Sequence, residues 1–254
     1  SGDLFGSAIT EVGDVDDSSP REFAVSSPGA GKVYVFFDDQ GLDLSAELDD
    51  VVVISGNVSD RFGESISGGL NINGELEDFI DFDGSDDEQV DLDDKTDLIV
   101  GAPGINGDTG SVFVYSDEDL EEANEDGTPL TPISVISGSN PGDNFGASVA
   151  LLTDVNPDIE IEDEDTANVL DFDSTSADIL IGAPGVNGGS GAIFIFYGEE
   201  TFSGNKNAAD ADITFNGINP GGGFGSTVLN AGDISDDELQ DVVVGGNGFI
   251  EVLY

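Results

Sequence analysis

The chain has 254 residues, and its 5 Lys and Arg residues against 55 Asp and Glu residues give a formal net charge of −50. This balance excludes nucleic acids and anionic membrane surfaces as expected partners, because both are bound through clustered basic side chains, and no apolar run is long enough to span a bilayer. The chain has no His and no Cys, which removes the commonest general base, the thiol nucleophile and disulfides, so we do not expect an enzyme.

The first repeat, residues 2–56, opens with the dipeptide Phe-Gly at Phe5 and continues into an acidic loop. Three apolar runs follow: "FAVSSPG" from Phe23, "KVYVFF" from Lys32, and Val51–Ser55. These runs are rich in β-branched and aromatic residues and are bounded by Gly, Pro, Asn and Asp, which predicts short strands. With the segment after Phe-Gly, the repeat is expected to hold four strands.

The second repeat, residues 57–138, and the third, residues 139–217, show the same order of features. The second has Phe62 and the runs Asp97–Val100, Ser111–Tyr115 and Ser134–Ser137. The third has Phe145, "LIGAPG", "AIFIFYG" and Asp212–Phe215. The fourth, residues 218–254, has Phe224, "VVVGGNG" and "FIEVLY" and lacks the last run. Only the acidic tracts Leu120–Asn124 and Asp236–Leu239 could hold a helical turn.

Both faces of the predicted strands are apolar. In "SVFVYS", Val112 and Val114 point to one side and Phe113 and Tyr115 to the other, so a sheet of such strands needs a neighbour on each face. Repeated four-stranded units with this property predict an all-β fold, a β-propeller, in which residues 1–254 form one domain of four blades with about four antiparallel strands each. A two-sheet sandwich is the alternative. The phenylalanines of Phe-Gly are expected to be wedged between blades.

The missing run in the last repeat leaves three arrangements open. The chain could close as a ring of four blades with one blade three-stranded, which we favour. It could be part of a longer array, or two chains could complete each other.

The acidic loops of the first and fourth repeats share one pattern. Positions 1, 3, 5, 7 and 9 are Asp14, Asp16, Ser18, Pro20 and Glu22 in the first loop and Asp233, Ser235, Asp237, Leu239 and Asp241 in the fourth. Side chains at alternate positions of a tight loop, with a backbone carbonyl at position 7, can converge on one ion. Calcium is the expected ion, because it takes six to eight oxygen ligands in a tolerant geometry. A solvated acidic loop is the alternative.

The second and third loops are longer, and their assignment has two registers. We assign Asn71, Asn73 and Glu75 with Asp97 to the second site, and Asp154, Asn156 and Asp158 with Asp178 to the third. In the rival register Asp91 and Asp93 accompany Asp97, and Asp171 and Asp173 accompany Asp178. The chain is thus predicted to bind up to four calcium ions, one per repeat.

The Phe-Gly start, the acidic loop and the literal "GAP" at Gly101–Pro103 and Gly182–Pro184 together resemble the FG-GAP repeat of integrin α-subunit propellers and of many bacterial surface proteins. "GAP" is replaced by "SSP" at Ser26–Pro28 and by "GGN" at Gly245–Asn247. The resemblance covers nearly the whole chain. It implies that Phe-Gly opens the innermost strand of each blade, that the cation loop leads to the second strand, and that "GAP" ends that strand. Integrin propellers have seven blades, whereas this chain has four repeats.

The resemblance implies a calcium-binding adhesion or protein-interaction module of an extracellular or cell-surface protein. A protein or glycan ligand would bind the face opposite the cation loops. The candidate contact residues are Arg61, Asn106, Asp108, Asn187 and Asn219. A lectin-like carbohydrate-binding module would need exposed aromatic residues in these turns, where only Phe249 fits, and a structural spacer of a large surface protein is a further alternative. The oligomeric state is left open.

Overall fold

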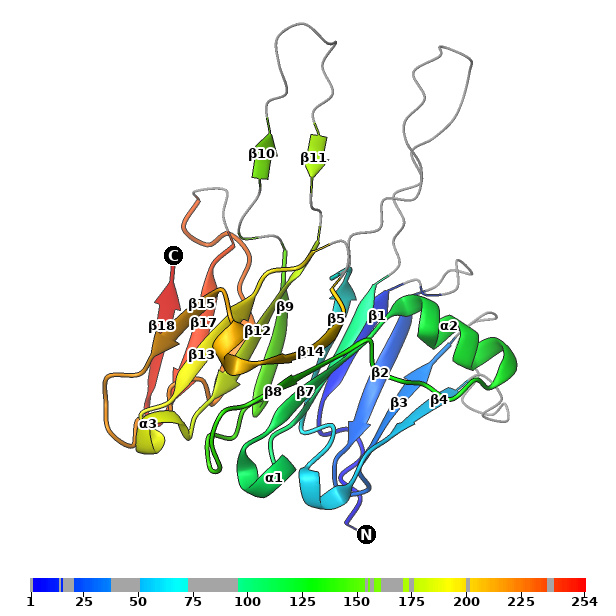
Figure 1. Cartoon of the computed structure of the whole chain (residues 1–254), viewed down its shortest axis with the longest axis horizontal. Helices are drawn as coiled ribbons and strands as arrows, with labels where there is room; N and C mark the ends of the chain where they lie inside the picture. Colours follow the sequence, from blue (N-terminus) through cyan, green and yellow to red (C-terminus); the bar gives the residue numbers. More distant parts are fainter. Residues whose placement is uncertain are drawn as a thin grey trace, which may run out of the picture.

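The computed structural model of the chain confirms the all-β prediction and shows four main sheets (Figure 1). The structure describes residues 2–13, 15, 21–37, 51–72, 96–153, 155, 158–160, 171–173, 176–199, 202–236 and 240–254. The sheets follow one another in chain order, from the N-terminal sheet at one end of a row to the C-terminal sheet at the other.

The first two sheets are antiparallel meanders. The first consists of β1 (Ile9–Gly13), β2 (Glu22–Ser27), β3 (Lys32–Phe36) and β4 (Val51–Ser55) in that order. The second consists of β5 (Ser65–Leu70), β6 (Asp97–Ala102), β7 (Ser111–Tyr115) and β8 (Ser134–Ser137). Each predicted run in these two repeats forms a strand, since its β-branched and aromatic side chains suit a pleated sheet that is covered on one or both faces.

The third sheet has four strands and the fourth has three, as the repeat pattern predicts. The third consists of β9 (Ser148–Leu152), β12 (Asp178–Ala183), β13 (Ala192–Phe196) and β15 (Ile213–Asn216). The fourth consists of β16 (Thr227–Asn230), β17 (Val242–Gly246) and β18 (Phe249–Leu253). A separate hairpin of β10 (Asp158–Glu160) and β11 (Asp171–Asp173) projects from the third repeat (Figure 1).

Two segments that follow a third strand reach back to the preceding sheet. Helix α2 (Asp117–Asp126) follows β7 and packs against β4, and it replaces the single helical turn expected around Leu120. Strand β14 (Gly204–Asn207) follows β13 and pairs in parallel with β8, which gives the second sheet a fifth strand. The Ser116 side chain caps α2 by accepting a hydrogen bond from Asp119 N.

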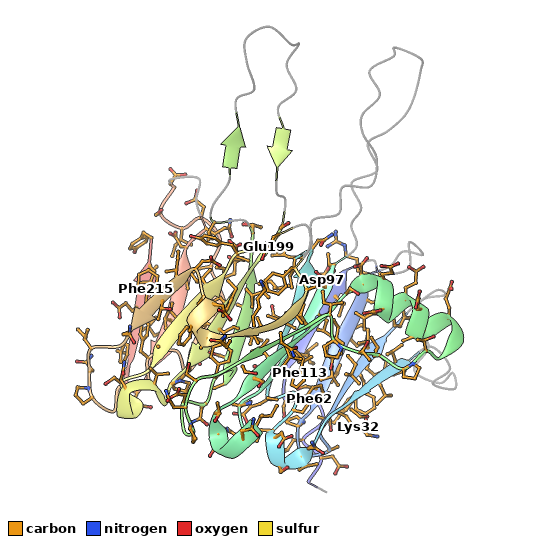
Figure 2. All side chains as sticks on the ribbon, viewed as in Figure 1. Lys32, Phe62, Asp97, Phe113, Glu199 and Phe215 are labelled. Atoms are coloured by element: carbon orange, nitrogen blue, oxygen red, sulfur yellow. The ribbon has the colours of Figure 1, made fainter. Side chains whose placement is uncertain are left out.

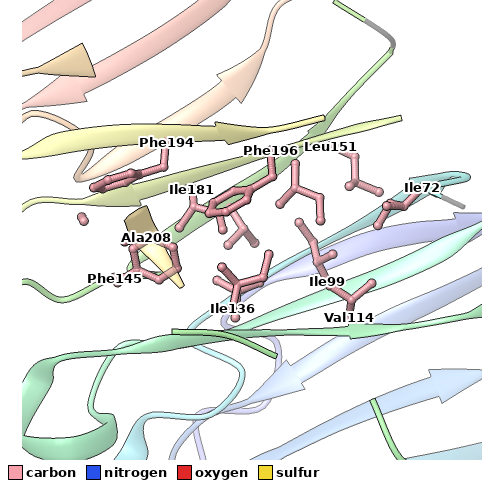
Figure 3. Packing of buried hydrophobic residues seen from close by; sticks show 14 of the residues in the cluster. Ile72, Ile99, Val114, Ile136, Phe145, Leu151, Ile181, Phe194, Phe196 and Ala208 are labelled. Atoms are coloured by element: carbon pink, nitrogen blue, oxygen red, sulfur yellow. The ribbon is translucent and has the colours of Figure 1, made fainter. Parts of the chain in front are cut away.

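The hydrophobic core consists of three clusters, and each lies between two successive sheets. The first cluster joins Val33 and Val35 of β3 to Leu98 and Val100 of β6. The middle one, shown in Figure 3, joins the second and third sheets, and the last joins the third and fourth. Val112 and Val114 belong to the middle cluster and Tyr115 to the first, so the prediction that both faces of this sheet are covered is confirmed.

The first strands of the four sheets contact each other in chain order: β1 with β5, β5 with β9, and β9 with β16. Among the described residues, no contact of comparable extent joins β16 back to β1. The row of sheets is therefore open in this part of the chain, and the closed ring of four is not formed by it.

The phenylalanines of Phe-Gly are buried in three repeats, where Phe62, Phe145 and Phe224 are 3%, 1% and 4% exposed. Each ring packs on an aromatic ring from the third strand of its own sheet, for example Phe145 on Phe194 with centroids 5.3 Å apart. Phe5 also contacts Tyr34 but is 60% exposed. The predicted packing of the Phe-Gly ring between two sheets is therefore absent in the first repeat, because no sheet of the described chain packs on that side of Phe5.

Contacts between the glycines of Phe-Gly and of "GAP" explain why the two motifs recur together. The Gly146 backbone N–H donates to the Gly182 carbonyl within the third sheet at 3.0 Å, and the Gly63 N–H donates likewise to Gly101 in the second. Between sheets, a Cβ atom on Gly101 would collide with the Gly146 carbonyl, and one on Gly182 would collide with the Gly225 carbonyl. Each "GAP" glycine therefore lets the next Phe-Gly approach its sheet.

We predict that Gly182→Ala lowers the free energy of unfolding by about 1–3 kcal/mol, because the added methyl group meets backbone that cannot move aside. Gly245→Ala is the matched control. Gly245 occupies the same place in the fourth repeat, but its nearest described neighbour would lie 3.4 Å from the new Cβ, so we expect little change. Chemical denaturation measures both, and equal losses would contradict the proposed close approach.

Candidate metal loops

The four acidic loops join the first strand of each sheet to its second strand. They begin at the rim that is uppermost in Figure 1, and Figure 2 places Asp97 near this rim and Phe62 toward the opposite one. One carboxylate stands at or immediately before the second strand in every sheet. These four residues, which we call the closing carboxylates, are Glu22, Asp97, Asp178 and Asp241, and all are fully buried.

Each closing carboxylate accepts a hydrogen bond from the backbone at the start of its own loop. The donors and distances are Val15 N to Glu22 Oε2, 2.6 Å; Ile72 N to Asp97 Oδ2, 2.7 Å; Val155 N to Asp178 Oδ2, 2.7 Å; and Ile234 N to Asp241 Oδ2, 2.7 Å. The donor is loop position 2 in the first and fourth repeats. The same bond therefore places Asn71 and Asp154 at position 1 of the second and third loops.

The sequence carries a signal for this alignment in the residue that follows position 1 of each loop. The residue after position 1 is Val15, Ile72, Val155 or Ile234, a β-branched apolar residue in every loop. Val15 and Ile72 are fully buried, and Ile72 belongs to the middle core cluster. In the first two loops, burial of this side chain in the core holds its N–H where the closing carboxylate can accept from it, whereas Ile234 in the fourth loop is 57% exposed.

The second oxygen of the closing carboxylate is also held in two repeats. Asp178 Oδ1 accepts from Gly198 N at 2.9 Å, and Asp97 Oδ1 accepts from Asp117 N at 3.3 Å. Both donors lie just beyond the third strand, β13 or β7. The closing carboxylate thus connects three parts of its repeat: the loop, the second strand and the segment after the third strand. Sequence reasoning did not identify Asp117 or Gly198.

The fourth loop shows how the two ends of the acidic pattern meet. Asp241 Oδ2 also accepts from Ser235 N at 2.8 Å, and Asp233 Oδ1 accepts from Asp236 N at 2.6 Å. Asp236 has a left-handed φ of 66°. Positions 1 and 9 therefore hold the same tight turn, 233–236, and Asp241 Oδ1 is buried with no hydrogen-bond partner among the described residues.

Several predicted ligands lie outside the described residues. They are Asp14, Asp16, Ser18, Pro20, Asn73, Glu75, Asp154, Asn156, Asp237 and Leu239, and in the rival register Asp91 and Asp93. Asp158, expected in a loop, lies instead in β10, where its register partner is Asp173 of β11. Within the described residues, no group of three or more acidic side chains is placed to hold a metal ion.

The candidate contact residues at the opposite rim have structural roles. Arg61 donates to Asp108 Oδ1 at 3.1 Å and to Asn144 Oδ1 at 2.6 Å, which ties the second repeat to the third. Asn106 lies in the turn α1 (Ile105–Asp108) and Asn187 in the turn α3 (Val186–Gly189), with left-handed φ values of 52° and 53°. Asn tolerates this conformation better than most residues. The backbone of the two turns therefore explains why Asn occurs there, without a role in ligand binding.

The remaining candidates at this rim are Asn219 and Phe249. Asn219 is exposed, and its carbonyl accepts from Gly222 N in the turn before Phe224. Phe249 is stacked on Phe224 with ring centroids 6.4 Å apart. The aromatic ring that a carbohydrate-binding module would need is therefore part of the packing of the fourth sheet.

No known protein-family profile matches the chain. Among the described residues, no helix combines the length and the apolar character needed to cross a bilayer.

We predict that Asp178→Ala destabilises the fold even in the presence of a chelator, by about 1–3 kcal/mol for each N–H left without its acceptor. The two donors concerned are Val155 N and Gly198 N. Glu251→Ala, which removes an exposed carboxylate, is the control and should leave stability nearly unchanged. If denaturation in EGTA showed the two variants to be equally stable, the structural role of the closing carboxylate would be wrong.

Proposed function

We propose that this chain is a calcium-stabilised β-propeller module of the FG-GAP type that serves adhesion or protein interaction on the outside of cells. The observation that carries the proposal is the closing carboxylate, which is fully buried in all four repeats and bonded to its own acidic loop.

The propeller part of the proposal is supported by how the sheets pack. Successive sheets bury apolar clusters between their faces, and their first strands lie next to each other in chain order. Blades of a propeller pack on one another in the same way, which supports the proposal. The link from "GAP" to the next Phe-Gly repeats between the second and third sheets and between the third and fourth, as expected of equivalent units.

The calcium part is supported by charge. Five basic side chains cannot neutralise 55 acidic ones, and carboxylates crowded into one loop repel each other unless a cation lies among them. Burying a carboxylate costs free energy unless the carboxylate is paired with a cation or well hydrogen-bonded. The N–H donors of the loops supply some of these hydrogen bonds. A chain with oxygen donors and no His or Cys suits calcium better than softer metals.

The adhesion part follows from the resemblance in sequence. Calcium is abundant outside cells, so even weak sites would be filled there. The rim opposite the loops would then be the surface that meets a ligand, with Arg61, Asp108 and Asn144 as one connected polar patch.

Removal of calcium should lower the melting temperature by many degrees. Each ion that binds only the folded chain adds about 2.7 kcal/mol when its free concentration is a hundred times its dissociation constant. Thermal unfolding in calcium and in EGTA measures the difference, and magnesium at the same ionic strength is the control. Identical melting curves would contradict metal-dependent stability.

Asp233→Ala should remove about one bound calcium ion per chain. Asp233 is position 1 of the fourth loop and holds the 233–236 turn through Asp236 N. Calorimetric titration counts the ions, and Asp210→Ala, a change in an acidic residue of the short helix at 208–210, should leave the count unchanged. An unaltered count in Asp233→Ala would show that the fourth loop is not a site.

A further inference from the structure

We propose that two copies of this chain associate head to tail, with the outer face of the C-terminal sheet of one copy packed on the outer face of the N-terminal sheet of the other. The first face, called the C-terminal face, consists of Leu229, Val243, Ile250 and Val252. The second, called the N-terminal face, consists of Phe5, Ile9, Phe23, Tyr34, Phe36 and Val53. The inference does not depend on calcium or on the proposed function.

The C-terminal face is an uncovered copy of a surface that is buried elsewhere in the chain. Val228, Val242 and Val244 pack into the cluster between the third and fourth sheets, so the alternate residues of β16 and β17 point the other way. Leu229, Val243 and Val252 are neighbours across the three strands. Ile250 is 75% exposed, whereas its equivalents Val112 and Ile193 are 0% exposed.

The N-terminal face shows the same contrast. Ile9 is the fourth residue after Phe5, and the corresponding residues Ile66, Val149 and Val228 are 7–8% exposed and lie in the three core clusters. Ile9 itself is 68% exposed. Phe5 is uncovered for the same reason, and Phe23 and Phe36 stack on each other across β2 and β3 at 4.9 Å.

The three internal interfaces show what such faces bind. In each one, the face that carries the Phe-Gly ring packs on the opposite face of the preceding sheet. The N-terminal face carries the Phe-Gly ring of its sheet, and the C-terminal face is the opposite face of the last sheet. The two faces therefore match each other as the faces at the internal interfaces do. They lie at opposite ends of an open row, so each face of one copy can meet the matching face of a second copy.

The symmetry of the contact follows from this match. An interface between two different faces is heterologous, so it closes into a ring if the rotation between copies allows and extends into a longer assembly if it does not. Two copies would supply eight sheets, which is within the usual range of propeller blades. Uncovered apolar faces of this kind are uncommon on chains that stay monomeric.

The test uses two variants that each disable one face. Ile9→Asp removes the N-terminal face and Ile250→Asp removes the C-terminal face, and both residues are exposed, so folding should persist. Light scattering after size-exclusion chromatography is run in calcium-containing buffer with about 1 M NaCl, where the Debye length is about 3 Å and the chains repel each other little. Circular dichroism checks that each variant is folded.

The wild-type chain should elute as a dimer or larger species, and each variant alone as a monomer. A mixture of the two variants should form a one-to-one dimer and nothing larger, because one intact face of each kind remains. Ile218→Asp, a change at an exposed residue in the turn before Phe224, should associate like the wild type. A monomeric wild type, association that survives either variant, or mixed variants that stay apart would each overturn the proposal.

Discussion

The structure depends on one constraint, which is that each sheet has apolar side chains on both faces. Val112 and Val114 of β7 enter one core cluster while Tyr115 enters another, so the second sheet is stable only between two neighbours. Each following sheet also needs a neighbour to cover its apolar face, so the chain forms a row of packed sheets instead of separate hairpins. The constraint also explains the glycines at 101 and 182, because sheets that must pack face to face need places where backbone can meet backbone.

The acidic loops are connected to this constraint through the closing carboxylates. Asp178 bonds to the loop at Val155 and to the backbone beyond β13 at Gly198, while Ile179 and Ile181 of the same strand lie in the core between sheets. A residue expected only to bind metal thus also fixes the connection between strands. Any ion held in the loop would stabilise the sheet beneath it as well as the loop.

Much of the fold could be predicted because its signal is local and repeated. The strand at Ser111–Tyr115 has the predicted bounds, and the buried Phe62 and Phe145 follow from the repeat. Three features could not be predicted. The pairing of β14 with β8 joins residues 70 positions apart, the exposure of Phe5 depends on which sheets are present, and the hairpin at Asp158 replaces an expected loop. In the loops, the pattern predicted the closing residues, whereas their N–H partners beyond the third strand are set by tertiary packing.

The central claim is that each acidic loop binds a calcium ion. Its most direct test is a crystal structure of the chain grown in calcium, with anomalous diffraction data that locate the ions. The claim predicts one anomalous peak in each acidic loop, with oxygen ligands at about 2.3–2.6 Å that include the residue at position 1. Ordered loops without such peaks, closed only by the hydrogen bonds to Glu22, Asp97, Asp178 and Asp241, would contradict it.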